Sequence, residues 1–233
     1  MERVTAGWIM AATFELTRKH LLALALFSIA LGALTTGFDS FDAGTGLRVG
    51  ELIGGFVAGY FLLLHLIDCE GLLVVDKAGI RLLPFFGALI LTSIGVLFGL
   101  LFFIIPGLIL MARWSIAYSL VISDGLSMVD AMRESWDCTR SAQWSIVGAY
   151  AVFFLTIVAA IVSVSVMAGA IGGIVEVSDF DTVRMAKSEF TGLAGAFAIN
   201  CLLQGMTGVG YVIAVAIQKG VRNTGKRIEM VFE

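Results

Sequence analysis

A long uncharged segment dominates the middle of this chain. Between Arg81 and Asp124, the only charged residue is Arg113. As one helix this segment would be about 63 Å long, about twice the thickness of the hydrocarbon core of a bilayer. It must therefore reverse direction. We predict the hairpin turn at Pro106 and Gly107, because proline removes a backbone donor and glycine permits unusual dihedral angles.

The composition indicates the same environment. Hydrophobic residues make up 59% of the chain and charged residues 14%, whereas a soluble protein is about half apolar and a quarter charged. The polar residues cluster between apolar blocks that exceed the roughly 18 residues needed to cross a bilayer. We therefore predict an all-α polytopic integral membrane protein with a single membrane domain over residues 1–233.

Six transmembrane helices are predicted, arranged as three hairpins. They cover residues of about 21–38, 52–67, 84–104, 108–123, 145–172 and 191–217. With the amino terminus in the cytoplasm, only Arg48, Arg184 and Lys187 fall on the opposite side. The cytoplasmic side then holds Arg3, Arg18, Lys19, Lys77, Arg81, Arg133, Arg140, Lys219, Arg222, Lys226 and Arg227. The positive-inside rule thus predicts that both termini are cytoplasmic.

Two amphipathic segments precede predicted spans, at about 4–18 and 128–141, and we expect them to be interfacial helices on the cytoplasmic surface. The sequences FELTRKHLLALALF and WDCTRSAQWSIVGA, which end them, each place an aromatic residue and Thr-Arg just before a span. This similarity predicts a repeated unit of a surface segment followed by a hairpin. Residues 68–83 are a candidate third copy.

The second amphipathic segment has the clearer pattern. Ser127 followed by Asp130 is typical of a helix start. Methionine and valine residues lie along one stripe, and charged residues occupy the other side, where Arg133 and Asp137 are four positions apart. The candidate interfacial residues of this segment and its exit are Arg133, Asp137, Arg140 and Trp144.

Residues 104–144 resemble a pattern found in prokaryotic membrane proteins. The family includes the membrane domain attached to some glycerophosphodiester phosphodiesterases and related uncharacterised six-span proteins. The matching positions are Pro106, Gly107, Arg113, Ala117, Gly125, Ala131, Ser135, Thr139 and Trp144, and Tyr118 departs from the pattern, which often has proline there. The resemblance implies a multi-pass domain of the prokaryotic cytoplasmic (inner) membrane. It implies no phosphodiesterase activity, because that activity belongs to a separate soluble barrel.

Arg113 is the one cation within the predicted spans, and an intramembrane ionisable residue is a functional candidate by default. No acidic residue lies within a predicted span to pair with it. Near the Pro-Gly end of its helix, its long side chain can reach outward while Trp114 lies at the interface. Two interpretations follow: structural anchoring, which we favour, or contact of Arg113 and Trp114 with an anionic lipid or substrate.

The sixth span carries a polar face and several glycines. Its polar residues recur at helical spacing, and the glycines permit close helix approach. We favour interhelical hydrogen bonding and packing for this face. The alternative is a polar path for a solute, with Ser163 and Ser165 as partners on the fifth span. The candidate face consists of Asn200, Gln204, Thr207 and Tyr211.

Near the end of the second span, His65, Asp68 and Cys69 can share a helix face. We interpret them as a polar helix end rather than a metal site, because only three ligands of mixed type are visible. The basic tail at 218–227 is interpreted as cytoplasmic anchoring, with an anionic-lipid patch as the alternative. We expect no cofactor and no metal.

The sequence contains no nucleophile–base arrangement, no paired membrane carboxylates and no phosphate-binding loop. We therefore expect a non-catalytic protein that interacts with lipids, organises the membrane or serves as a subunit of a larger membrane assembly. Its expected partners are membrane lipids, including anionic ones, and a second copy or another membrane protein; nucleic acid is not expected. The alternative is a small-solute transporter or channel subunit.

Overall fold

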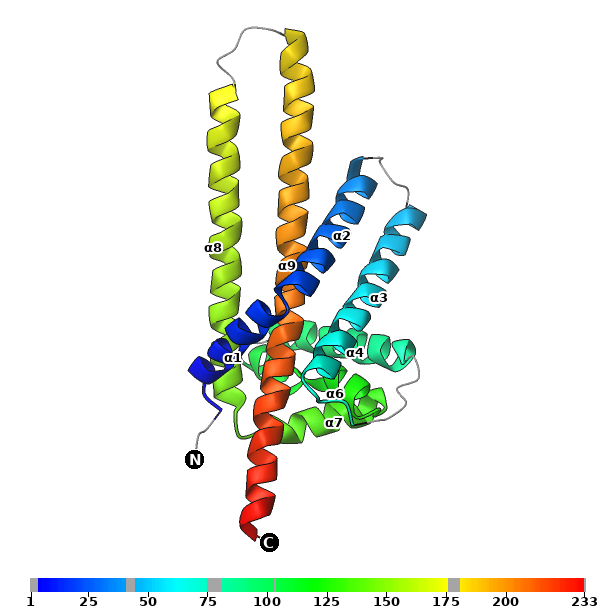
Figure 1. The fold of residues 1–233 in the computed structure, drawn as a ribbon, viewed down its shortest axis with the longest axis vertical. Coiled ribbons are helices and arrows are strands. Elements are labelled where there is room, and N and C mark those ends of the chain that lie inside the picture. Colours follow the sequence, from blue (N-terminus) through cyan, green and yellow to red (C-terminus); the bar gives the residue numbers. More distant parts are fainter. Residues whose placement is uncertain (1–3, 41–44, 75–80, 103, 176–180, 233) are drawn as a thin grey trace. The chain divides into compact units, whose positions relative to one another are not determined.

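The computed structural model describes residues 4–40, 45–74, 81–102, 104–175 and 181–232, and every regular element in these ranges is an α-helix. Among the basic residues used to predict the orientation, Arg3 and Lys77 lie outside these ranges, and the side chains of Arg48, Arg184, Lys187, Lys226 and Arg227 also lie outside the description. The helices (Figure 1) are α1 (Ala6–Lys19), α2 (Leu21–Ser40), α3 (Thr45–Cys69), α4 (Leu82–Phe102), α5 (Ile104–Arg113), α6 (Ala117–Ser123), α7 (Met128–Cys138), α8 (Gln143–Val175) and α9 (Asp181–Phe232).

Six segments are long and apolar enough to cross a membrane. Many of their large apolar side chains are exposed: Leu83 is 82% exposed, Leu22 76% and Phe154 64%. Apolar surface in water costs about 25 cal/mol per Å², so such side chains suit a lipid environment. The prediction of an all-helical protein with six candidate spans is confirmed for the described residues, and the segments are Leu21–Phe38, Val49–Cys69, Leu82–Gly99, Ile105–Ser123, Gln143–Ala160 and Gly195–Asn223.

The chain forms two compact units, and each is built from segments that are distant in the sequence. Helices α3, α8 and α9 contribute residues to both units. The first unit comprises Met1–Leu21, Phe56–Ala151 and Val209–Glu233, and the second comprises Leu22–Gly55 and Val152–Gly208.

In the second unit, small residues bring α2 and α9 close together. A Cβ atom added at Gly32 would lie 2.9 Å from the backbone nitrogen of Cys201. A Cβ atom at Gly205 would lie 3.0 Å from the hydroxyl of Ser28. Glycine at such positions permits the close backbone approach that stabilises helix pairs in membranes.

In the first unit, α4 packs against α5, α6 and α7, and α7 also contacts α5 and α6. α1 lies against the carboxyl-terminal part of α9, where the ring of Trp8 occupies the space that a side chain at Gly220 would fill. These contacts combine the two predicted surface segments with the middle of the chain in one unit.

The turn between the third and fourth predicted spans differs from the prediction. Pro106 and Gly107 lie within the first turn of α5, and α4 ends before them at Phe102. Proline is tolerated in the first turn because its missing N–H would have no helical partner there. Gly107 serves close packing instead, since a Cβ atom at Gly99 of α4 would lie 2.8 Å from the Cα atom of Gly107.

This close approach gives a first prediction. Gly99→Val is expected to lower the free energy of unfolding by about 2 kcal/mol, because overpacking against backbone forces a helix shift. Gly37→Val is the matched control, since nothing lies within 4 Å of a Cβ atom at Gly37. Thermal unfolding in detergent measures both variants. Equal stability of the two would show that α4 and α5 do not pack through this contact.

Both predicted surface segments are helical. α7 begins as predicted, because the Ser127 hydroxyl accepts a hydrogen bond from the Asp130 N–H at 3.3 Å. Thr5 caps the start of α1 in the same manner, with its hydroxyl accepting from the Trp8 N–H at 3.2 Å. The candidate third copy at 68–83 is different: α3 continues to Cys69, a turn with Gly71 at a φ of 64° follows, and residues 75–80 lie outside the description.

Other helix bounds also differ from the predicted spans, and α3 and α9 begin earlier than expected, at Thr45 and Asp181. The segment expected as one span at 108–123 consists of α5 and α6, separated at residues 114–116. The last span continues without a break through the predicted basic tail, as part of α9. No proline occurs between residues 191 and 233, so no residue in this stretch removes a backbone donor and ends the helix.

Candidate functional site

The candidate site lies where α5 ends and α6 begins. The Ala117 N–H donates to the carbonyl of Trp114 at 3.1 Å, rather than to the carbonyl of Arg113 as a continuous helix requires. The Arg113 carbonyl therefore loses its helical partner. A buried carbonyl left without a donor costs about 1–3 kcal/mol, so another element must supply one.

α7 supplies the missing donors. The Ser135 hydroxyl donates to the Arg113 carbonyl at 2.6 Å. The Thr139 hydroxyl lies 3.2 Å from the same carbonyl and 2.6 Å from the Ser135 carbonyl. Both hydroxyl-bearing residues are fully buried. The carbonyl that the helix break leaves free thus accepts hydrogen bonds from the buried hydroxyls of Ser135 and Thr139.

The side chain of Arg113 makes a second connection to α7. Its Nη1 donates to the Trp136 carbonyl at 2.9 Å, and its guanidinium carbon lies 4.9 Å from the centroid of the Trp136 ring. Arg113 is only 9% exposed, and its Nε has no hydrogen-bond partner among the described residues. We call Arg113, Ser135, Trp136 and Thr139 the α5–α7 clasp.

The clasp corrects the predicted surroundings of Arg113. We expected its side chain to extend toward the outer interface, away from the surface helix at 128–141. The structure places it against that helix instead, where its Nη1 atom donates to the Trp136 carbonyl. Arg113, Ser135 and Thr139 also belong to the motif that carries the resemblance, so these motif positions hold the two helices together.

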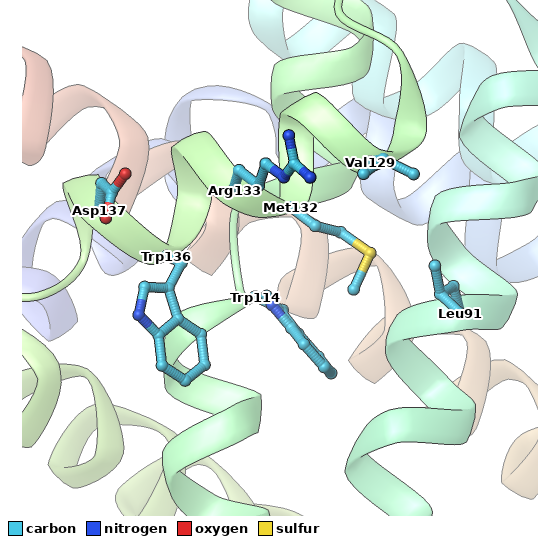
Figure 2. A pocket seen from close by; sticks show the side chains of 7 residues that line it. All are labelled: Leu91, Trp114, Val129, Met132, Arg133, Trp136 and Asp137. Atoms are coloured by element: carbon cyan, nitrogen blue, oxygen red, sulfur yellow. The ribbon is translucent and has the colours of Figure 1, made fainter.

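A pocket of about 370 Å³ lies beside the clasp. Figure 2 shows the rings of Trp114 and Trp136 and the side chain of Met132 gathered beside α7, with Leu91 facing them from α4. Val129 completes the apolar wall, and the exposed side chains of Arg133 and Asp137 add one charge of each sign. This pocket was not predicted, although five of its lining residues belong to or flank the amphipathic segment: Val129, Met132, Arg133, Trp136 and Asp137.

The other two candidate interfacial residues, Arg140 and Trp144, do not line this pocket. Arg140 is exposed, and Trp144 at the start of α8 is 70% exposed. Tryptophan is enriched where the apolar and polar parts of a membrane meet. The interfacial position of Trp144 stays a prediction.

The ends of α1 and α3 meet Lys219 of α9 at Glu70. Lys19 and Lys219 donate to its two carboxylate oxygens at 2.5 and 2.7 Å, and the Nε2 atom of His20 lies 3.4 Å from it. Burial alone would raise the pKa of Glu70, but the hydrogen bonds from Lys19, Lys219 and His20 outweigh it and lower the pKa to about 2. Glu70 is thus a buried anion that joins three chain segments.

A second polar group, not predicted from the sequence, joins α9 to the end of α6. Arg222 donates to the Leu72 carbonyl at 2.7 Å and to the Ser123 hydroxyl at 3.3 Å, and it forms an ion pair with Asp124. The fully buried Gln218 donates to the same hydroxyl at 2.7 Å. Gln218 and Arg222 are four residues apart in a continuous helix and share a face, which is the signal that could have revealed this group.

The four candidate residues of the last span have different surroundings. The Asn200 amide donates to the Thr36 hydroxyl of α2 at 3.0 Å, within the second unit. Thr207 is exposed and donates to the Leu203 carbonyl of its own helix. Tyr211 belongs to the first unit, where its ring packs edge-on against Tyr118. Gln204 is half-buried, and the side chain of Ser165 lies outside the description.

The thiol of Cys138 on α7 provides a second prediction. Burial and a hydrogen bond to Glu134 at 3.3 Å raise the pKa of Cys138 to about 12. The thiolate is the reactive form, and its fraction at neutral pH falls roughly a thousandfold. Because a more basic thiolate is also a stronger nucleophile, Cys138 is expected to react with maleimide roughly a hundredfold more slowly than an unperturbed thiol. A Cys69→Ser, Cys201→Ser variant isolates this thiol. Its rate should rise with pH, and equal rates for the folded and unfolded variant would contradict the prediction.

No family model matches the chain, and neither the search of curated proteins nor the search of solved structures returned a match.

Proposed function

We propose that the chain is a non-catalytic integral membrane protein of a prokaryotic cytoplasmic membrane, and that its pocket beside α7 binds a membrane phospholipid. The pocket itself is the observation that carries this proposal. It combines an apolar wall with one exposed cation, Arg133, on an amphipathic helix of the kind that lies at a membrane surface.

The shape and chemistry of the pocket suit the junction between an acyl chain and a headgroup. Leu91, Trp114 and Met132 offer apolar and aromatic surface, and such surface is what ligand pockets mainly present. Arg133 supplies donors for a phosphate oxygen, which guanidinium groups bind with paired hydrogen bonds. The Arg113 guanidinium donates to the Trp136 carbonyl within the clasp, so its role is to position the wall of the pocket. Arg133 is then the residue that contacts the lipid.

The orientation with both termini cytoplasmic belongs to the same proposal. Lys19, Lys219 and Arg222, which the positive-inside rule assigns to the cytoplasm, gather in one unit around Glu70 and Asp124. α7 belongs to that unit as well. The pocket would therefore face lipids of the inner leaflet, where an anionic surface favours cations by about 1 kcal/mol each.

Native mass spectrometry of the chain released from nanodiscs tests the lipid site. Arg133→Ala is expected to retain about tenfold less phosphatidylglycerol, since a hydrogen bond to a charged group contributes about 1.5–3 kcal/mol. Arg140→Ala is the matched control, because Arg140 is exposed and does not line the pocket. Nanodiscs of phosphatidylethanolamine show whether the net charge of the lipid matters. Equal retention by both variants would remove the pocket as a lipid site.

The transporter alternative predicts a different result. A polar path along residues 196–218 would make single cysteines there react with water-soluble reagents in a helical stripe. We expect protection instead, because Asn200 uses its amide to bind Thr36 of the neighbouring helix, which is the interhelical hydrogen bonding typical of membrane bundles. A reactive stripe would favour transport over the proposed function.

A further inference from the structure

Three metal-ligating side chains converge at the junction between α1 and α2. His20 is the residue between these helices, and His65 and Cys69 lie at the end of α3. One ligand atom from each of the three lies within 4.8 Å of the others. From the sequence, the third member of the group with His65 and Cys69 was Asp68. In the structure, the third member is His20, which is distant in the sequence.

The helix geometry explains part of this arrangement. His65 and Cys69 are four residues apart on α3, so they lie on one face, and the Cys69 sulfur is 3.8 Å from both ring nitrogens of His65. The His20 ring meets the His65 ring edge-on, with 5.7 Å between the centroids. His20 is buried, whereas His65 and Cys69 are exposed.

We propose that His20, His65 and Cys69 form a three-ligand site for Zn²⁺. Zinc favours imidazole and thiolate ligands at about 2.0–2.3 Å in a tetrahedron, which places the ligand atoms about 3.3–3.7 Å apart. The pair on α3, at 3.8 Å, is close to that spacing, and rotation of the side chains would bring all three ligand atoms to it. Binding requires that the Cys69 thiol release its proton to water. Because two of the ligands are exposed, the fourth position is open to water.

Glu70 completes the site as a positioning residue. Its carboxylate contacts the Nε2 atom of His20 at 3.4 Å. Histidine ligands of metals usually donate their second ring N–H to a carboxylate, which fixes the tautomer and the ring direction. The neighbouring Lys19 and Lys219 are paired with Glu70, and a Cys69 thiolate adds the negative charge that a dication requires.

A bound metal ion would cross-link segments that are far apart in the chain. Zn²⁺ would join the end of the first surface helix to the end of α3, next to the point where Lys219 of α9 also meets Glu70. This site is independent of the lipid pocket beside α7, since the two share no lining residue.

Titration of the chelator-treated full chain with Co²⁺, followed by Zn²⁺ displacement, tests the site. We expect one Co²⁺ per chain and a thiolate-to-cobalt charge-transfer band. Cys69→Ser should abolish the band and weaken binding at least tenfold, whereas Cys138→Ser and Cys201→Ser, which remove the other thiols of the chain, should leave both unchanged. Circular dichroism confirms that each variant is folded.

The two histidines are tested separately. His20→Gln and His65→Gln should each weaken Co²⁺ binding at least tenfold while the Cys69 thiol remains. Normal affinity in His20→Gln would overturn the proposal, because the site would then be a two-residue chelate on α3. A charge-transfer band that persists in Cys69→Ser, or binding by the wild type that does not saturate, would overturn it as well.

Discussion

Replacing Ser135 with alanine and Thr139 with valine in one chain is expected to lower the free energy of unfolding by about 3 kcal/mol. Both hydroxyls are fully buried and lie within hydrogen-bond distance of the Arg113 carbonyl. That carbonyl cannot regain its helical partner, because the Ala117 N–H is engaged by Trp114. The double variant therefore leaves a buried acceptor without a donor.

The control for this variant is a pair of hydroxyls that serve only their own helix. Ser163 and Thr156 of α8 are exposed and donate to backbone carbonyls four residues earlier, at 2.7 and 2.9 Å. Ser163→Ala with Thr156→Val should change stability by less than about 0.5 kcal/mol, as is usual for surface substitutions. Unfolding in a series of detergent–denaturant mixtures measures both pairs. Equal losses would show that α7 does not hold the α5–α6 break.

The contributions of the Ser135 hydroxyl on α7 and of the Thr139 hydroxyl at its C-terminal cap can be separated. Ser135 makes the shorter contact with the Arg113 carbonyl, at 2.6 Å, while Thr139 also lies 2.6 Å from the Ser135 carbonyl. A hydroxyl donates only one proton. Ser135→Ala alone should therefore cost more than Thr139→Val alone, and the double variant should cost more than either because Thr139 can replace Ser135 as a donor.

The membrane class and the surface helix were predictable because local patterns determine them. The apolar blocks exceed the length of a bilayer crossing, and Ser127 and Asp130 form the start of α7 through contacts three residues apart. The same logic explains the error at the hairpin. Pro106 and Gly107 are typical of a turn, yet the first turn of a helix tolerates both, and the sequence alone does not distinguish these positions.

The break between α5 and α6 could not be predicted from its own residues. Residues 114–116 are Trp-Ser-Ile, which contain neither glycine nor proline. The break depends on donors that Ser135 and Thr139 supply from another helix. Hydrogen bonds from a distant part of the chain leave no pattern in the local sequence. The local sequence therefore predicts one continuous span.

The repeated sequence shows how similar segments acquire different contacts. Thr17 and Thr139 occupy equivalent positions of the two repeats. The hydroxyl of Thr139 bonds within the clasp, whereas the buried hydroxyl of Thr17 has no hydrogen-bond partner among the described residues. The repeat therefore predicts a helix followed by a span, but the clasp requires Arg113, which precedes only the second copy.

Replacing Arg222 with methionine is also expected to lower the free energy of unfolding by about 3 kcal/mol. Arg222 binds the Leu72 carbonyl, the Ser123 hydroxyl and the Asp124 carboxylate. Its side chain and that of Asp124 are each only 24% exposed. Removing the cation leaves a largely buried carboxylate and a carbonyl without their donor, which is the costly way to break such a pair.

Arg140→Met controls for the loss of a positive charge, because Arg140 is exposed; its stability should stay near that of the wild type. A second substitution then separates the ion pair from the packing of α9. Asp124→Leu in the Arg222→Met background removes the unpaired carboxylate, and replacing both partners of a buried pair is often nearly neutral. We therefore expect the double variant to be more stable than Arg222→Met alone. A double variant no more stable than Arg222→Met would instead show that Arg222 acts mainly through the Leu72 carbonyl. The connection after α3, rather than the end of α6, would then be what holds α9 in place.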